Sequence, residues 1–270
     1  MPVRLRNNLR EKLYEITLKS LFAQKSKNWK AIIVGDDESK FSDQHLIHLK
    51  GDDLPKIEKL SMALDFIAVH PEIKPDYIIR LDEDDIVSAD YLYDIENVSE
   101  KFDVYYDRYH VCIDPVYMKI SYRDNNWIAN TAIHKYEHAI KKCGPDNKIL
   151  FLQNHDQFWH QYYADKKIYY SRMKSPLYFR ILTPYSITSS SLTKDARTDW
   201  NKYSVYLNSY GPWIGLDKSF PLFDELKKIS IAFKSARPKK TSLYWVYNLI
   251  KHYRNLFFDN IKKIIHPLEN

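Results

Sequence analysis

The sequence is poor in glycine and cysteine and has no long apolar run. Its 270 residues include five glycines, none of them clustered, and two cysteines, Cys112 and Cys143. Scattered glycines argue against a glycine-rich phosphate loop, and the cysteines form neither a disulfide framework nor a Cys-x-x-Cys metal pair. No apolar run approaches the roughly 18 residues that span a bilayer. We therefore expect a globular protein in a reducing cytoplasm, not an integral membrane protein.

Positive charge is concentrated at the end of the chain. Residues 227–270 carry ten Lys or Arg against two acidic residues, a net charge of +8, so the first 226 residues carry −2 of the total of +6. This asymmetry argues against a nucleic-acid groove spread over the fold and favours a local patch that faces an anionic surface.

The same basic segment is also rich in apolar residues. Between Leu243 and Ile265 they recur at helical spacing, interleaved with Lys and Arg. That pattern is typical of a basic amphipathic helix lying in a membrane interface. The alternative is a helix that packs its apolar face on the body of the protein.

The stretch that says most about function is an apolar run followed directly by four acidic residues. Tyr77-Ile78-Ile79-Arg80-Leu81 leads directly into Asp82-Glu83-Asp84-Asp85. Neighbouring carboxylates repel and raise one another's pKa, so such a cluster needs a metal ion, a cationic ligand or water to offset it. A β-rich run before an acidic loop is typical of the carboxyl end of a buried strand, where open α/β sheets bind ligands. A divalent metal that holds a phosphate is the leading interpretation.

Strand and helix patterns alternate along the first hundred residues. A helix ends near Gln24, a strand covers 30–34, a helix covers 60–67, and the strand 77–81 follows. This alternation predicts an α/β protein with a mainly parallel sheet flanked by helices. Aromatic and β-branched runs beyond residue 101 add a small antiparallel part.

These elements resemble the nucleotide-sugar half of the GT-A glycosyltransferases, especially family 2. Ser20-Leu21-Phe22-Ala23-Gln24 matches that family's S-L-x-A-Q, the strand 31–34 ends in Gly35-Asp36-Asp37, and Asp82-Glu83-Asp84 matches its D-x-D signature. The resemblance covers residues 1 to about 100 well, 101 to about 200 loosely, and the tail not at all. It implies a Rossmann-like GT-A fold.

The resemblance also implies a division of the first 226 residues. Residues 1–100 are expected to be the nucleotide-sugar-binding half and 101–226 the acceptor-binding and catalytic half of the same domain. The charge and the apolar pattern, not the resemblance, mark 227–270 as a basic amphipathic helical tail.

Matching positions imply roles for the acidic residues. Asp84 is expected to bind Mn²⁺ or Mg²⁺, with Asp82 reaching the ribose or the metal and Glu83 pointing outward as a spacer. Oxygen ligands suit both cations. Asp36 or Asp37 matches the aspartate that binds the nucleotide base or ribose, and the Gly35-Asp36-Asp37 order leaves open which of the two it is.

An inverting transferase also needs a base for the acceptor hydroxyl. Asp156, in the first turn of a predicted helix, matches the family's acidic residue and is our general base. His155 is the competing candidate, because an imidazole titrates near neutral pH. Trp127, Asn130 and Thr131 are the candidate acceptor contacts.

One departure from the family concerns the start of the fold. Family members usually open with a full strand followed by Pro-x-Tyr or Pro-x-Phe, whereas here Met1-Pro2-Val3-Arg4 has almost no strand before the proline. Arg4 stands in place of the aromatic residue that lies near the base. Its guanidinium can stack on the base or meet the diphosphate.

The sequence as a whole predicts a metal-dependent, inverting glycosyltransferase of cell-surface polysaccharide biosynthesis. Its expected partners are a nucleotide-sugar donor and a saccharide or lipid-linked acceptor, with no nucleic acid. We expect a cytoplasmic protein with peripheral contact, through 227–270, at the inner face of the bacterial membrane. The alternatives are a sugar-nucleotide nucleotidyltransferase and a non-catalytic nucleotide- or metal-binding module of the same fold.

Overall fold

The structure is a computed structural model that describes residues 1–5, 8–35, 41–51, 53–124, 132–153, 156–171, 176–184 and 200–236. The chain divides into two compact units, Met1–Phe233 and Lys234–Asn270. Of the second unit, only the last turn of one helix lies among the described residues. The divisions expected at residues 100 and 226 stay predictions.

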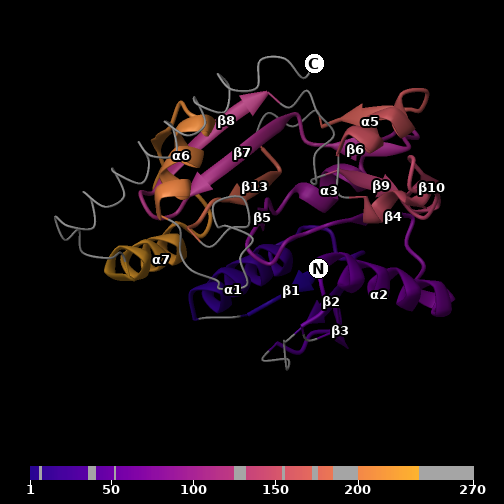
Figure 1. The fold of residues 1–270 in the computed structure, drawn as a ribbon, viewed down its shortest axis with the longest axis horizontal. Coiled ribbons are helices and arrows are strands. Elements are labelled where there is room, and N and C mark those ends of the chain that lie inside the picture. Colours follow the sequence, from indigo (N-terminus) through magenta and orange to yellow (C-terminus); the bar gives the residue numbers. More distant parts are fainter. Residues whose placement is uncertain are drawn as a thin grey trace, which may run out of the picture. The chain divides into compact units, whose positions relative to one another are not determined.

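The first sheet is parallel, as the alternation of strands and helices predicted. Its order is β1 (Pro2–Val3), β2 (Ala31–Gly35) and β3 (Leu46–Lys50), and both strand pairs are parallel. The helices α1 (Asn8–Phe22) and α2 (Lys56–Val69) follow β1 and β3 in the chain (Figure 1). Helix α2 contains no glycine or proline, and Pro71 follows directly after its C-cap residue His70, where a helix cannot continue.

Close approach of two strand ends explains the glycine that ends β2. Gly35 has φ of 154°, and a Cβ placed there would lie 2.0 Å from the carbonyl oxygen of Val3. No side chain fits in that space, so glycine lets the ends of β1 and β2 converge beside the start of α2.

The second sheet has the order β12-β6-β9-β4. Its strands are β4 (Tyr77–Ile79), β6 (Val104–Tyr106), β9 (Ile133–Lys135) and β12 (Ile168–Tyr170). Around it in the chain lie η1 (Pro71–Ile73), α3 (Tyr91–Glu96), α4 (Tyr136–Ala139), the hairpin β10 (Lys142–Cys143) and β11 (Lys148–Ile149), η2 (Leu150–Leu152) and α5 (Asp156–Tyr163).

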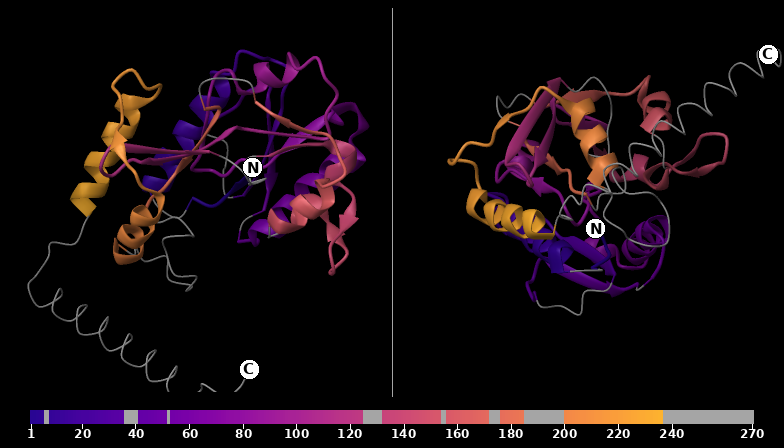
Figure 2. Two further views of the ribbon diagram at one scale, coloured as in Figure 1. Left: turned by 90° about the horizontal axis from the view of Figure 1, so that it is seen from above. Right: turned by 60° about the vertical axis from the view of Figure 1, so that its left-hand side comes forward.

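The third sheet has the order β14-β8-β7-β13-β5. Its strands are β5 (Ile86–Val87), β7 (Tyr109–Asp114), β8 (Lys119–Asp124), β13 (Tyr178–Ile181) and β14 (Ile214–Gly215). The helices α6 (Trp200–Tyr210) and α7 (Phe223–Ala236) complete the described elements (Figure 2).

The antiparallel part is larger than the sequence suggested. Among the described strands, only β12 with β6 and β13 with β7 pair in parallel outside the first sheet, and the other pairs are antiparallel. For the longest of these pairs the reason is connection length, because the short segment 115–118 between β7 and β8 can join only antiparallel strands. The protein is therefore a mixed α/β fold.

Helix α1 contributes to two hydrophobic cores. Tyr14 and Leu18 pack in the core that includes β1 and β2, whereas Leu13 and Ile16 pack in the core of the third sheet. Helix α1 therefore contributes buried residues to both cores, and it also contacts β5.

The described start of the predicted tail packs on the body. Ile229 and Phe233 of α7 are buried in the core of the third sheet, and the Ser230 hydroxyl donates to the carbonyl oxygen of Val116 at 2.8 Å. The apolar pattern between Leu243 and Ile265, on which both interpretations of the tail depend, lies in residues 237–270, outside the described residues, so both interpretations stay predictions.

Candidate functional site

The acidic loop lies between β4 and β5, where the sequence predicted it. Asp82, Glu83 and Asp84 are half-buried, Asp85 is buried, and the Asp85 amide donates to the Asp82 carbonyl oxygen at 3.3 Å. The turn brings four carboxylates together at the junction of the second and third sheets. Each of the four has a different environment.

Asp82 is paired with a lysine from the start of α2. The Lys56 ammonium donates to both carboxylate oxygens, at 2.5 and 2.8 Å. Burial acts to raise the pKa of Asp82, but Lys56 outweighs this effect and the net shift is downward. Asp82 is therefore held in the charged form by a cation of the protein itself.

Glu83 points toward α1, so the expectation of an outward spacer was wrong. Its carboxylate accepts from Arg10 at 2.8 Å, and its carbonyl oxygen accepts from the Thr17 hydroxyl at 3.0 Å. Burial, followed by the neighbouring charge of Asp84, raises the pKa of Glu83 to about 7 against the opposing effect of Arg10. Glu83 thus fastens the loop to the helix shared by both cores.

Asp85 is a structural carboxylate. It accepts from the Tyr178 hydroxyl at 2.5 Å and from the Ile181 amide at 2.9 Å, both on β13. Burial, and then the charges of Asp84 and Asp82, raise its pKa well above the ordinary value. No role for Asp85 was predicted, because its partners lie on a strand 93 and 96 residues further along the chain.

Asp84 is the carboxylate that the fold leaves open. Among the described residues its side chain forms no hydrogen bond and no ion pair. Burial and the neighbouring Asp82 raise its pKa, while the charges of Arg10, Lys56 and Arg180 act in the opposite direction. A carboxylate in this position is suited to an added cation.

The loop fits a metal ion that is shared with a ligand. No group of three or more His, Cys, Asp or Glu among the described residues is arranged to hold a metal. Magnesium, however, is usually bound by one or two carboxylates together with substrate phosphates, so a complete protein cage is not required. Asp84 has no hydrogen-bond or ion-pair partner among the described residues and so could supply one such carboxylate, whereas Asp82 is paired with Lys56.

Arg80 joins the acidic loop to the segment that precedes the predicted base. This buried guanidinium lies 5.1 Å from the ring of Phe151 and 5.0 Å from that of Trp159, and donates to the Gln153 carbonyl oxygen at 3.1 Å. Gln153 is three residues before Asp156. Sequence analysis missed this role, although a lone arginine inside an apolar strand pattern was a usable signal.

Among the other predicted site residues, Arg4 is the one whose side chain the structure describes. Arg4 forms a loose surface ion pair with Asp53 at 3.8 Å. Asp156 is the first residue of α5, and its side chain is not described. The remaining candidates lie outside the described residues, and their roles stay predictions: Asp36, Asp37, Trp127, Asn130, Thr131 and His155.

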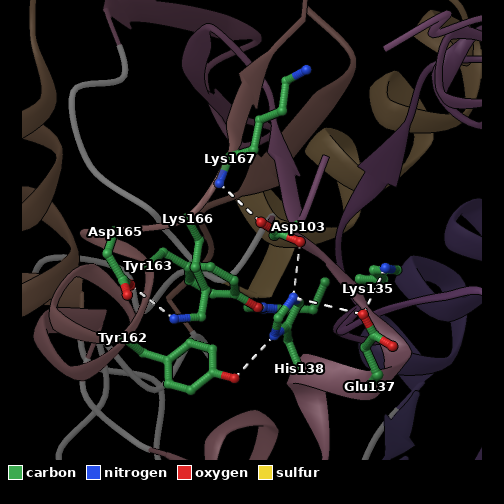
Figure 3. A network of polar contacts seen from close by, with 10 residues as sticks. Asp103, Lys135, Glu137, His138, Tyr162, Tyr163, Asp165, Lys166 and Lys167 are labelled. Atoms are coloured by element: carbon green, nitrogen blue, oxygen red, sulfur yellow. Dashed lines mark hydrogen bonds and ion pairs between the residues drawn. The ribbon is translucent and has the colours of Figure 1, made fainter. Parts of the chain in front are cut away.

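A second polar cluster lies beside the start of β4, whereas the acidic loop follows its end. His138 Nε2 lies 2.9 Å from an oxygen of Asp103, and Nδ1 lies 3.0 Å from the Tyr162 hydroxyl (Figure 3). Asp103 also accepts from the Lys167 amide at 2.9 Å. These contacts connect α4 and α5 to β6 and β12, so we assign the cluster a structural role.

Comparison with solved structures finds a likeness of fold, whereas the two sequence comparisons find no match. No protein-family model matches the chain, and no curated protein matches it. Among solved structures, residues 1–349 of TarS from S. aureus, a staphylococcal wall teichoic acid glycosyltransferase, are 13% identical with a TM-score of 0.42. The match covers 68% of this chain and 59% of that one, which is less than two thirds of its length. A likeness at this level assigns neither a family nor an activity to this chain.

Proposed function

We propose that this protein is a metal-dependent, inverting glycosyltransferase that moves a sugar from a nucleotide-sugar donor to a saccharide or lipid-linked saccharide acceptor. The observation that carries the proposal is the acidic loop after β4. Three of its carboxylates are held by Lys56, Arg10 and Tyr178, whereas Asp84 is open. A loop with only structural duties would have no need to keep an unpartnered, half-buried carboxylate beside three others.

In this proposal the D-x-D carboxylates serve the donor. Asp84 holds Mn²⁺ or Mg²⁺ together with the diphosphate, and Asp82 reaches the metal or the ribose. When bound, the metal supplies Lewis-acid assistance to the departing nucleoside diphosphate. Asp36 or Asp37 accepts a hydrogen bond from the base or ribose, and Arg4 stacks on the base or meets the diphosphate.

The acceptor side supplies the proton transfer. As the acceptor oxygen forms a bond to the anomeric carbon, the bond from that carbon to the diphosphate oxygen breaks and the hydroxyl proton passes to Asp156. His155 is the alternative base, and Trp127, Asn130 and Thr131 orient the acceptor. Arg80 supports this arrangement, because it fixes Gln153, and with it the start of α5, to the end of β4.

The basic tail suggests where the reaction takes place. We propose peripheral contact between residues after Ala236 and anionic lipid at the cytoplasmic face of a bacterial membrane, where a lipid-linked acceptor would be found. In the part of the chain that the structure describes, no helix is long and apolar enough to cross a membrane.

A donor screen tests the proposal. Purified protein is mixed with UDP-, dTDP- and GDP-sugars with and without Mn²⁺, and both the melting temperature and nucleoside diphosphate release are measured. A bound donor raises the melting temperature because it binds only the folded state. A nucleotidyltransferase would instead release pyrophosphate from a nucleoside triphosphate and a sugar phosphate. Absence of nucleoside diphosphate release from every donor, with and without acceptors, would argue against the proposed function.

A further inference from the structure

The pairing of Lys56 with Asp82 sets apart the two carboxylates of the D-x-D sequence. Lys56 donates to both oxygens of Asp82, whereas Asp84 has no partner among the described residues. Two carboxylates that look equivalent in the sequence are therefore unequal before any ligand arrives. One is neutralised by a lysine and the other is open.

The position of Lys56 is unusual for a residue that only stabilises a helix. It is the first residue of α2 and directly follows the N-cap residue Pro55, whose side chain cannot cap the helix. A positive charge in the first turn is opposed by the helix dipole, which favours anions at that end. Lys56 thus gains its stabilising contact from Asp82 and not from its own helix. Residues that go against the charge preference of a helix end are expected mainly at functional sites.

A buried contact one turn later fixes where Lys56 stands. Lys59 is buried and donates to the Val3 carbonyl oxygen at the end of β1, at 2.6 Å. The same ammonium lies 3.1 Å from the position that a Cβ on Gly35 would take. The start of α2 is therefore held at the carboxyl ends of β1 and β2, which is where parallel sheets bind ligands.

Lys56 also keeps capacity for a ligand. An ammonium group has three N–H donors, and among the described residues Lys56 has no hydrogen-bond acceptor other than the two oxygens of Asp82. Its side chain is 36% exposed and that of Asp82 is 31% exposed, so a ligand can reach the pair. By contrast, the Arg10–Glu83 pair is 17% and 13% exposed, which suits a structural contact.

We propose that Lys56 is a positioning residue that reserves Asp82 until the donor binds. Without a donor, Lys56 occupies Asp82 and leaves Asp84 as the single open carboxylate, so a divalent metal alone binds weakly. A diphosphate gives Lys56 a second anionic partner and supplies oxygens to the metal, so metal and diphosphate bind cooperatively. This inference rests on the proposed function, because the diphosphate is that of the donor.

Manganese binding measured without any sugar nucleotide tests the inference. The free Mn²⁺ concentration is followed by electron paramagnetic resonance during titration of the wild type, Lys56→Met and Lys25→Met. Lys25 is a matched control, since it also forms a 2.5 Å ion pair with an aspartate, Asp90, and its loss changes the net charge equally. Each titration is repeated with inorganic pyrophosphate in place of the donor.

We expect Lys56→Met to bind Mn²⁺ alone about tenfold more tightly than the wild type or more, because Asp82 is freed and one positive charge is removed. Pyrophosphate should then tighten Mn²⁺ binding less than in the wild type, since the coupling between the two ligands is reduced. In the double variant Lys56→Met with Asp82→Asn, Asp84 is again the single available carboxylate, so the Mn²⁺ affinity should fall back to about the wild-type value. Lys25→Met should behave as the wild type.

The conservative variant Lys56→Arg keeps the charge and should keep the weak, pyrophosphate-dependent binding. If Lys56→Met does not fold, Lys56→Gln replaces it in the same titrations. Equal Mn²⁺ affinity in Lys56→Met and Lys25→Met would overturn the inference, and so would a lower melting temperature without a change in affinity. Failure to release a nucleoside diphosphate would count against the proposed function but would leave this metal titration valid.

Discussion

The Tyr178 hydroxyl donates a hydrogen bond to Asp85 at 2.5 Å and so ties the acidic loop to β13, 93 residues further along the chain. The amide of Ile181, at the other end of β13, donates to the other oxygen of Asp85 at 2.9 Å. Both oxygens of Asp85, the last carboxylate of the loop, therefore accept hydrogen bonds from β13. This arrangement fixes the loop without using Asp84.

Loss of the Tyr178 hydroxyl should destabilise the fold. Tyr178→Phe keeps the ring but leaves one oxygen of buried Asp85 without its donor, and we expect the free energy of unfolding to fall by about 1–3 kcal/mol. Urea denaturation measures this change. Tyr93→Phe, at a tyrosine that is 50% exposed, is the control and should have almost no effect. Equal stability of the two variants would contradict the structural role of Asp85.

Removal of the Arg80 guanidinium should loosen α5. Arg80→Met keeps an apolar stem but loses both the aromatic contacts with Phe151 and Trp159 and the hydrogen bond to Gln153. We expect a loss of about 2–3 kcal/mol in unfolding free energy and faster amide hydrogen exchange in α5. Arg108→Met removes an exposed guanidinium 5.8 Å from the Tyr109 ring and serves as the control. Unchanged exchange in α5 would rule out the proposed link.

His134, which is buried, and His110, which is half-buried, should make the protein less stable in acid. Burial first, then the positive charges of Arg80 and His138, lower the pKa of His134 to about 3, and burial with Arg180 and Arg123 lowers that of His110 to about 4. A folded-state pKa below the unfolded value of about 6.5 means that the unfolded chain binds more protons. The stabilisation is therefore complete above pH 6.5 and is lost as pH falls toward 4.

The slope of this pH dependence can be measured. Between pH 6.5 and 4, each histidine should lower the unfolding free energy by up to about 1.4 kcal/mol per pH unit. His134→Gln removes one titrating group, so its unfolding free energy should fall less steeply with acid than that of the wild type. Parallel curves for the two proteins would show that His134 does not remain neutral in the fold.

Membrane contact should depend on the residues after α7. Residues 237–270 carry seven Lys or Arg and two acidic residues, whereas Ile229 and Phe233 of α7 are buried in the body. We expect the full chain to float with vesicles that contain anionic lipid, and a chain ending at Ala236 to stay behind. Added salt should reduce the flotation. Equal flotation of both chains would show that residues 237–270 are not needed for membrane contact.

Local patterns predicted the elements that carry the candidate site, but not the contacts that distinguish its residues. Helix α1, strand β2, helix α2 and the Asp82–Asp85 loop were visible because apolar periodicity and a charge cluster are properties of neighbouring residues. Lys56, Arg10 and Tyr178 were not, because each meets its carboxylate across 26, 73 or 93 residues of sequence. Strand β3 was missed for a different reason. Its residues are only partly buried, and apolar and polar residues do not alternate clearly along it.

The most direct test of the proposed function is nucleoside diphosphate release by the wild type and by Asp84→Ala, with Mn²⁺ and the donor that raises the melting temperature most. Asp84 has no partner among the described residues, so the variant should fold and melt at the wild-type temperature or slightly above it. Asp146→Ala, at an exposed ion pair with Lys148, is the control. We predict that Asp84→Ala loses at least about a hundredfold in rate, whereas Asp146→Ala keeps it. A folded Asp84→Ala protein that releases nucleoside diphosphate at the full wild-type rate would contradict the account.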